Sequence, residues 1–289
     1  MRAFLRMSTS TFALALLSAP VAAMPFSFST GDPDGKIATA SRPDGSGKIE
    51  IESADDFILG ATTTITSASF IGLLAGAAVG DVGQVRVEIY RVFPNDSDVT
   101  RTSGPPTFST DQVPTRVNSP SDVEFFDPDI KALSITALSQ NFMAANSVLN
   151  GTNEKPNNTT GGDGPVTGQE VLFDVSFTQP FVLPPDHYFF VPQVEITDPD
   201  GEFYWLSAPR PIGGGTGPFA PDLQSWIRNE DLDPDWLRVG TDIVGGTPAP
   251  TFNADFSLTG TVPEPASLSL LALALTRLGV IRRRRSRHR

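Results

Sequence analysis

The sequence predicts an all-β protein whose folded part is a jelly-roll-like β-sandwich. Its 289 residues include 26 prolines and 25 glycines, which interrupt the chain too often for many helices. Between these breaks, short runs alternate apolar and polar side chains, as expected of strands that turn one face toward a core. We therefore expect one domain of two packed sheets over residues 48–260, rather than two small domains.

Six segments carry the strand pattern. The alternation is strict in residues 85–90 (Val-Arg-Val-Glu-Ile-Tyr), where every second side chain is apolar. The Asp-Pro-Asp-Gly sequence at 198–201 lies between two of the segments and predicts a hairpin turn. Short helical turns are predicted at 222–229 and 141–148. The other strand segments are 130–138, 170–178, 188–196, 202–207 and 252–258.

The N-terminal end has the pattern of an export signal. Residues 1–23 predict a secretory signal peptide, because two arginines precede an apolar run at 11–17 and a small-residue cleavage site follows at 21–23. A first transmembrane helix is the weaker alternative, since the apolar run is short. Glycine, proline and aspartate turn sequences over 24–47 predict a flexible leader before the sandwich.

Residues 261–289 form a segment of a different kind. A Pro-Glu-Pro sequence is followed by an apolar run at 266–281, which predicts a single transmembrane helix, and by an arginine-rich tail at 282–289. Sixteen helical residues span about 24 Å against a hydrocarbon core of about 30 Å, so the helix is short for a permanent span. A plain C-terminal membrane anchor is the alternative. The cytoplasmic stop-transfer flank is predicted at Arg282, Arg283, Arg284 and Arg285.

In the order and spacing of its parts, this segment resembles the PEP-CTERM sorting signal of bacterial proteins. Exosortases, which are membrane cysteine proteases, act on that family. The resemblance implies that Pro263, Glu264 and Pro265 are recognised at the outer face of the inner membrane. It also implies transient anchoring there, removal of the tail, and delivery to the cell surface or extracellular matrix of a Gram-negative-type bacterium. Arg277 departs from the usual all-apolar helix of the family.

The body of the chain is also similar to secreted bacterial β-sandwich proteins that end in such tails. The similar stretches are 54–57 (Ala-Asp-Asp-Phe), 85–98 and 221–229. This resemblance implies export and a β-sandwich fold. It does not indicate a reaction or any catalytic residues.

The exported part is strongly acidic. Nine of the 21 lysines and arginines lie in residues 1–23 and 261–289, whereas 32 of the 33 acidic residues lie in 24–260. The net charge of that part is therefore near −20, which disfavours binding to nucleic acid or anionic lipid. The chain has no cysteine, which excludes disulfides, thiolate metal sites and a cysteine nucleophile.

Catalytic patterns are sparse, and we expect a protein that is not an enzyme. The chain has two histidines, and a Ser-His-Asp site would have to use His187, since His288 lies in the tail. No Gly-x-Ser-x-Gly sequence is present. Glycoside hydrolysis needs only two carboxylates, so a secreted glycan hydrolase remains an alternative.

Two sets of side chains are candidates for binding. Aromatic rings could stack on sugars of an extracellular polysaccharide, which would make the domain a carbohydrate-binding module; core packing is the alternative. Three carboxylates at alternate positions could bind Ca²⁺, which is the one cofactor that the sequence suggests. Alternatively, these carboxylates are solvated side chains of a surface turn. The aromatic set is Tyr204, Trp205, Trp226 and Trp236, and the carboxylate set is Asp231, Asp233 and Asp235.

These patterns predict an exported cell-envelope or extracellular-matrix protein with a non-catalytic structural or binding role. The expected partners are an exosortase-like membrane protease, the inner membrane through residues 266–281, and extracellular polysaccharide.

Overall fold

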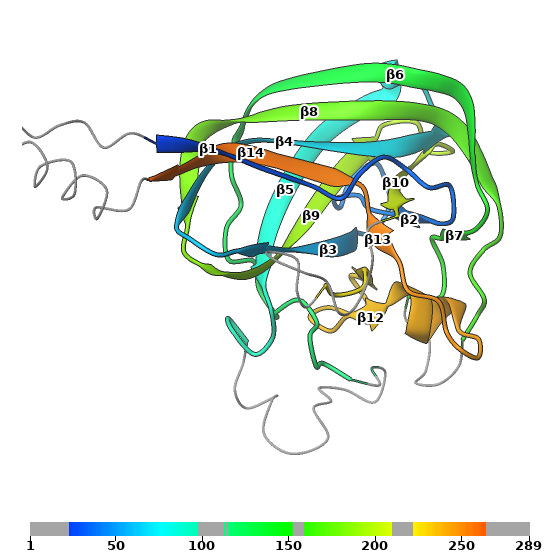
Figure 1. Cartoon of the computed structure of the whole chain (residues 1–289). Helices are drawn as coiled ribbons and strands as arrows, with labels where there is room; N and C mark the ends of the chain where they lie inside the picture. Colours follow the sequence, from blue (N-terminus) through cyan, green and yellow to red (C-terminus); the bar gives the residue numbers. More distant parts are fainter. Residues whose placement is uncertain (1–22, 98–112, 114, 153–158, 210–221, 264–289) are drawn as a thin grey trace, which may run out of the picture. The chain divides into compact units, whose positions relative to one another are not determined.

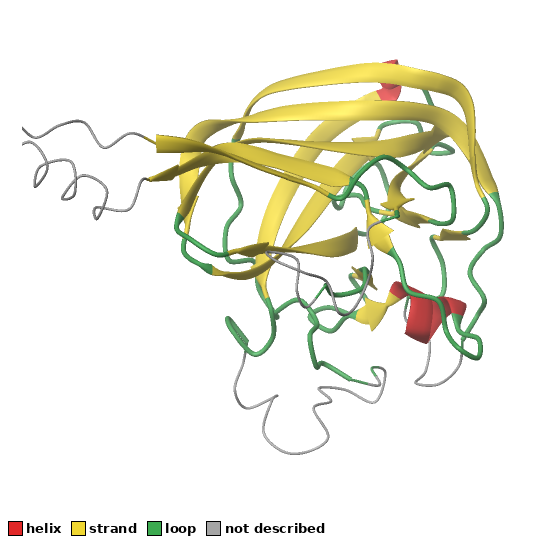
Figure 2. Cartoon of the chain, viewed as in Figure 1, coloured by secondary structure: helices red, strands yellow, loops and turns green. Residues whose placement is uncertain are grey.

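Strands are the main regular structure in residues 23–97, 113, 115–152, 159–209 and 222–263, which are the residues that the computed structural model describes. Apart from strands and loops, this part holds only a 3₁₀ turn, η1 (Val79–Asp81), and a short π-helical segment, η3 (Val239–Val244) (Figure 2). The chain divides into two units, one of residues 25–262 and one of the two ends, 1–24 and 263–289. Only residues 23, 24 and 263 of the second unit are described.

The described strands form two sheets (Figure 1). The larger sheet has the order β1-β14-β4-β10-β2-β7, with β8 paired to β4, β6 paired to β8 and β13 paired to β10. The smaller sheet has the order β12-β11-β3-β9-β5. The larger sheet contains β1 (Ala23–Ser29), β2 (Ala38–Ala40), β4 (Thr63–Ala75), β6 (Ile130–Ala144), β7 (Ser147–Val148), β8 (Val166–Leu183), β10 (Glu202–Ala208), β13 (Asn253–Ala254) and β14 (Phe256–Pro263). The smaller sheet contains β3 (Ile51–Leu59), β5 (Val82–Arg91), β9 (Asp186–Ile196), β11 (Trp226–Asn229) and β12 (Leu237–Arg238).

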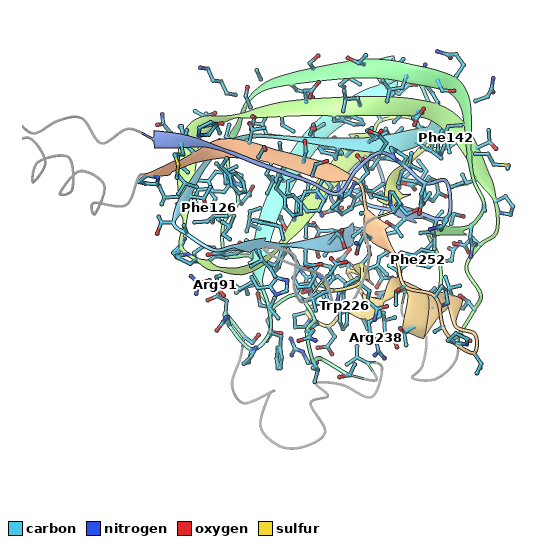
Figure 3. All side chains as sticks on the ribbon, viewed as in Figure 1. Arg91, Phe126, Phe142, Trp226, Arg238 and Phe252 are labelled. Carbon is cyan, nitrogen blue, oxygen red and sulfur yellow. The ribbon has the colours of Figure 1, made fainter. Side chains whose placement is uncertain are left out.

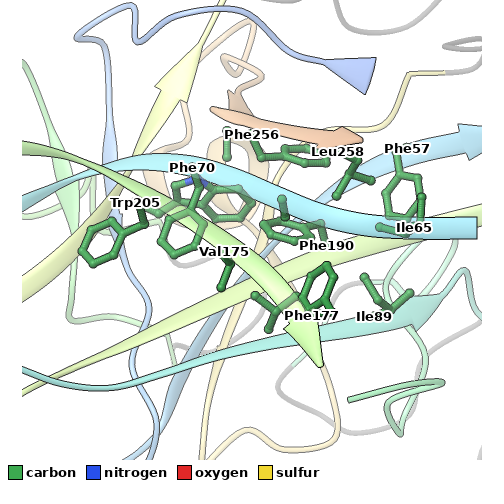
Figure 4. Close-up of a cluster of buried hydrophobic side chains, with 14 of the residues drawn as sticks. Phe57, Ile65, Phe70, Ile89, Val175, Phe177, Phe190, Trp205, Phe256 and Leu258 are labelled. Carbon is green, nitrogen blue, oxygen red and sulfur yellow. The ribbon is translucent and has the colours of Figure 1, made fainter. Parts of the chain in front are cut away.

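A phenylalanine-rich core joins the two sheets. Phe190 of β9 stacks on Phe256 of β14 with ring centroids 4.9 Å apart and an interplanar angle of 5° (Figure 4). In the larger sheet, Phe70 and Phe173 stack at 4.9 Å across β4 and β8. All four rings are fully buried. Offset aromatic stacking adds to the large apolar area that such rings bury, so this cluster holds the sheets face to face.

The smaller sheet is buried on its other face as well. A second cluster there contains Phe189 and Val191 of β9, Trp226 of β11, and Trp236. Figure 3 shows Trp226 among side chains below β3. Because both faces are covered, β9 is almost continuously buried instead of alternating with solvent.

All six predicted strand segments contain strands of the structure, but the predicted hairpin at 198–201 is wrong. The turn itself forms, since the amide of Gly201 donates to the carbonyl oxygen of Asp198 at 3.2 Å. The strands on either side of it lie in different sheets, β9 in the smaller and β10 in the larger. A turn sequence specifies a local reversal and not which strands then pair.

The two predicted helical turns are also wrong. Residues 226–229 form β11, which pairs with β3, and 141–148 contain the end of β6 and all of β7. Tertiary pairing outweighs local propensity in such short segments.

The expected leader at 24–47 belongs largely to the fold. Residues 25–29 lie in β1, and β2 is fully buried between β10 and β7. Alanines at 38 and 40 have side chains small enough for this enclosed strand.

The signal peptide, except residue 23, and the apolar run at 266–281 lie outside the described residues. Over the described ranges, no helix is both long and apolar enough to cross a membrane.

Candidate functional site

A polar groove of about 770 Å³ is the candidate binding site. It lies where β10 and the end of β11 meet the turn at 199–201 and the loop at 149–152. The side chains that the chemistry of the groove depends on are Arg42, Lys48, Glu202, Tyr204, Asn229 and Asp231.

Arg42 and Glu202 form an ion pair in the groove wall. Nη1 of Arg42 lies 2.5 Å from Oε2 of Glu202, and their side chains are only 10% and 12% exposed. Nε of Arg42 donates to the carbonyl oxygen of Ile49 at 3.1 Å, and Oε1 of Glu202 accepts from the amide of Phe203 at 3.1 Å. These bonds hold both groups in place, so the pair is a preorganised polar surface rather than two mobile side chains.

Tyr204 presents a hydroxyl group at the groove. Along β10, Phe203 and Trp205 belong to the core between the sheets. Tyr204 points the other way and packs in a different apolar cluster, with Leu73, Leu206 and Ile227. Its hydroxyl makes no hydrogen bond within the described residues, although it is not sealed from solvent. Burial, and then the charge of Glu202, raises the pKa of Tyr204 to about 12, so the group is a neutral hydroxyl at physiological pH.

Further polar atoms line the same groove. Nζ of Lys48 donates to the carbonyl oxygens of Gly201 and Asp198. Oδ1 of Asn229 accepts from the amide of Leu232 at 3.1 Å, and Nδ2 of Asn229 makes no hydrogen bond within the described part. Asp231 is exposed.

The predicted platform of tryptophan rings is wrong. Trp205, Trp226 and Trp236 are each 1% exposed, so none offers a ring face to a sugar. Trp205 lies in the core between the sheets, and the other two lie under the opposite face of the smaller sheet. Of the four aromatic candidates, only Tyr204 lines the groove.

The structure directs two carboxylates of the predicted calcium set to separate partners. Oδ1 of Asp233 lies 2.6 Å from Nη1 of Arg228, and Oδ1 of Asp235 lies 3.6 Å from Nη1 of Arg116. Asp235 is fully buried, whereas Asp231 is exposed at the groove. Among the described residues, no group of three or more His, Asp or Glu side chains is arranged to hold a metal ion.

A buried polar network lies on the face of the smaller sheet that is turned away from the larger sheet. No sequence motif indicates it. The hydroxyl of Tyr90 is 2.8 Å from Oε1 of Glu52, 2.9 Å from Oε2 of Glu88 and 2.9 Å from Nη2 of Arg228. The hydroxyl has one proton to donate, so one carboxyl group must carry a proton of its own to complete the set. Burial, and then the charge of Glu52, raises the pKa of Glu88 to about 8, although Arg86, whose Nε lies 2.9 Å from Oε1 of Glu88, acts in the opposite direction. We therefore expect Glu88 to be the group that keeps the proton.

His187 is a structural residue in this arrangement. Its Nε2 lies 2.6 Å from Oδ2 of Asp56, whose other oxygen accepts from the amide of Leu223 at 3.0 Å. The pair thus ties β9 and β3 to the segment before β11. A Ser-His-Asp site needs a hydroxyl group bonded to the imidazole, and no such bond is present within the described residues.

The groove therefore presents a fixed set of polar groups from several segments of the chain. Alternation in residues 202–206 does predict that Glu202 and Tyr204 share a face, but Arg42, Lys48 and Asn229 come from distant segments without a common motif. Comparisons of the chain with protein-family models, with curated proteins and with solved structures gave no match.

Proposed function

We propose that this chain is an exported bacterial envelope or extracellular-matrix protein, displayed through a C-terminal sorting segment that an exosortase-like membrane protease processes. The observation that carries the proposal is the sequence from Pro263 to Arg289: a Pro-Glu-Pro motif, a short apolar run and an arginine cluster, in that order. The arginines at 282–285 would stop transfer on the cytoplasmic side.

The extent of the folded unit supports this proposal. The unit covers residues 25–262, so it starts just after the expected signal-peptide cleavage site and stops just before Pro263. The last core side chain of β14 is Leu258, so cleavage at the motif would leave the buried core complete. The exported unit in this proposal is a jelly-roll-like sandwich, and the crossing from β9 to β10 between the sheets is consistent with that topology.

The proposed role of the displayed unit is not catalytic. A second candidate function, binding of extracellular polysaccharide, is favoured by the polar groove around Arg42, Glu202 and Tyr204. Its fixed ion pair and free hydroxyl are typical of sites that recognise hydroxylated ligands through hydrogen bonds.

Intact mass of the protein from its host tests the proposal, with membrane and culture fractions measured separately. We expect a mature species that begins near residue 24 and ends near Pro263–Pro265 at the surface or in the medium. The Glu264→Ala variant should accumulate in the membrane with Arg289 still present, while Glu230→Ala, which changes an exposed glutamate of the folded unit, should be processed normally. A wild-type protein found only in the membrane and still ending at Arg289 would make the tail a plain anchor.

A further inference from the structure

The groove is assembled from parts of the chain that are far apart in sequence but fixed in space. Arg42 and Glu202 are 160 residues apart and are joined by a hydrogen bond of 2.5 Å. Tyr204 is held by the pairing of β10 with β2, in which it lies opposite Ala40. A volume of about 770 Å³ lies within the range of small-ligand sites, about 300–1,000 Å³.

The hydrogen-bonding groups in the groove include both donors and acceptors. The hydroxyl of Tyr204 and Nδ2 of Asn229 make no hydrogen bond within the described residues, and both can donate. The carboxylates of Glu202 and Asp231 can accept. A sugar hydroxyl both donates and accepts, so neighbouring hydroxyl groups on one ring can satisfy the two kinds of atom together.

The charges of the groove decide between neutral and anionic ligands. The lining carries two cations, Arg42 and Lys48, and three carboxylates, on Asp200, Glu202 and Asp231. Glu202 already pairs with Arg42, and Nζ of Lys48 already donates to two backbone carbonyl oxygens. Three carboxylates against two cations leave the lining with a net negative charge, and both this lining and the acidic unit around it would repel an anionic ligand.

We propose that this groove is a binding site for a short stretch of neutral polysaccharide, held by hydrogen bonds from the hydroxyl of Tyr204 and the amide of Asn229 and by hydrogen bonds to the carboxylates of Glu202 and Asp231. This inference rests on the polysaccharide-binding role proposed above, and it adds the site and the charge class of the ligand.

Binding of the purified full chain to a panel of oligosaccharides tests it, measured by isothermal titration calorimetry. The panel contains neutral glucan, mannan, galactan and xylan oligomers and an oligouronate of the same length. We expect one or more neutral oligomers to bind and the oligouronate to bind more weakly. Tyr204→Phe, which removes only the hydroxyl, should raise the Kd roughly tenfold.

Tyr188→Phe is the matched control, because it also removes a tyrosine hydroxyl but one that donates to the carbonyl oxygen of Pro184 at 3.0 Å, outside the groove. Its Kd should change by less than about twofold. Asn229→Asp is a second variant that keeps the acceptor for the amide of Leu232 and loses the Nδ2 donor, and it should weaken binding as well. Thermal melts confirm that each variant is folded.

The outcomes separate this inference from the function on which it rests. If no member of the panel binds, both fail. If a neutral oligomer binds equally well to wild type, Tyr204→Phe and Asn229→Asp, the binding function stands and the groove is not its site. If the oligouronate binds most tightly, the charge class is wrong.

Discussion

Arg228 of β11 and Glu52 of β3 lie directly opposite each other in the smaller sheet and form an ion pair that is closed off from solvent. Their side chains are 6% and 5% exposed. The guanidinium of Arg228 also lies over the ring of Trp236, 4.4 Å from its centroid. Burial by itself would lower the pKa of Arg228, but Glu52, Tyr90 and Asp233 together outweigh it, so the arginine remains a cation.

Removal of one partner of this pair should be costly. Arg228→Met leaves Glu52 buried without its cation, and we expect a loss of roughly 3–5 kcal/mol in the free energy of unfolding. The double variant Arg228→Met, Glu52→Gln should recover part of that loss, because Glu52 then no longer leaves a buried charge without its cation. Urea denaturation of the full chain measures both.

The control for this prediction is Asp127→Asn. Asp127 pairs with Arg86 at 3.1 Å, and their side chains are 41% and 35% exposed, so the loss should be at most about 1 kcal/mol. If Arg228→Met lost no more free energy of unfolding than the control, the buried pair would not stabilise the fold as predicted.

Stability should fall as pH rises toward alkaline values, because two buried carboxyl groups hold protons in the folded state. The pKa of Glu88 is raised from 4.5 to about 8, by burial first and then by the charge of Glu52. The pKa of Asp255 is raised from 3.8 to about 8, mainly by burial. The folded state therefore binds more protons than the unfolded state between these values. The stabilisation is complete below the unfolded pKa and is lost as pH rises through about 8.

Urea denaturation at pH 5 and pH 9 checks this prediction. Glu88→Gln, which carries a permanently neutral amide, should lose less stability over this range than wild type does. Glu230→Gln, at an exposed position, should follow wild type. Equal pH dependence in Glu88→Gln and wild type would show that Glu88 does not hold the proton.

Gly72 should not tolerate a side chain. A Cβ atom there would lie 2.2 Å from the ring of Phe203 and 2.6 Å from the carbonyl oxygen of Tyr204. Gly72→Ala must therefore move β10 away from β4, and we expect a loss of about 1–3 kcal/mol or more. Gly80→Ala, whose Cβ meets nothing within 4 Å, should change stability by less than about 1 kcal/mol. A melting temperature for Gly72→Ala equal to that of wild type would contradict the close approach.

Calcium should have little effect on thermal stability. Asp233 and Asp235 already pair with Arg228 and Arg116, and an ion would have to compete with those arginines for their oxygens. We expect differential scanning fluorimetry to give the same melting temperature in millimolar Ca²⁺ and in chelator. A rise of several degrees in Ca²⁺ that is lost in Asp231→Asn would assign a calcium site to this turn.

Much of the candidate site could not be predicted from the sequence. The alternation in residues 202–206 does place Glu202 and Tyr204 on one face of a strand, but Arg42 and Asn229 join them only because β10 pairs with β2 and because the end of β11 reaches the same groove. The sequence leaves the tryptophans open between core packing and a sugar-binding platform, because an aromatic cluster has the same composition in both, and only the structure places them in the core.

The sequence by itself determined the strand-rich fold class and the positions of six strand segments, because period-two alternation and frequent prolines and glycines are local properties. Only the tertiary structure decided that β9 and β10 lie in different sheets and that the second face of the smaller sheet is buried. It also paired Arg228 with Glu52, residues far apart along the chain. Such contacts depend on which strands meet, and local sequence does not encode that choice.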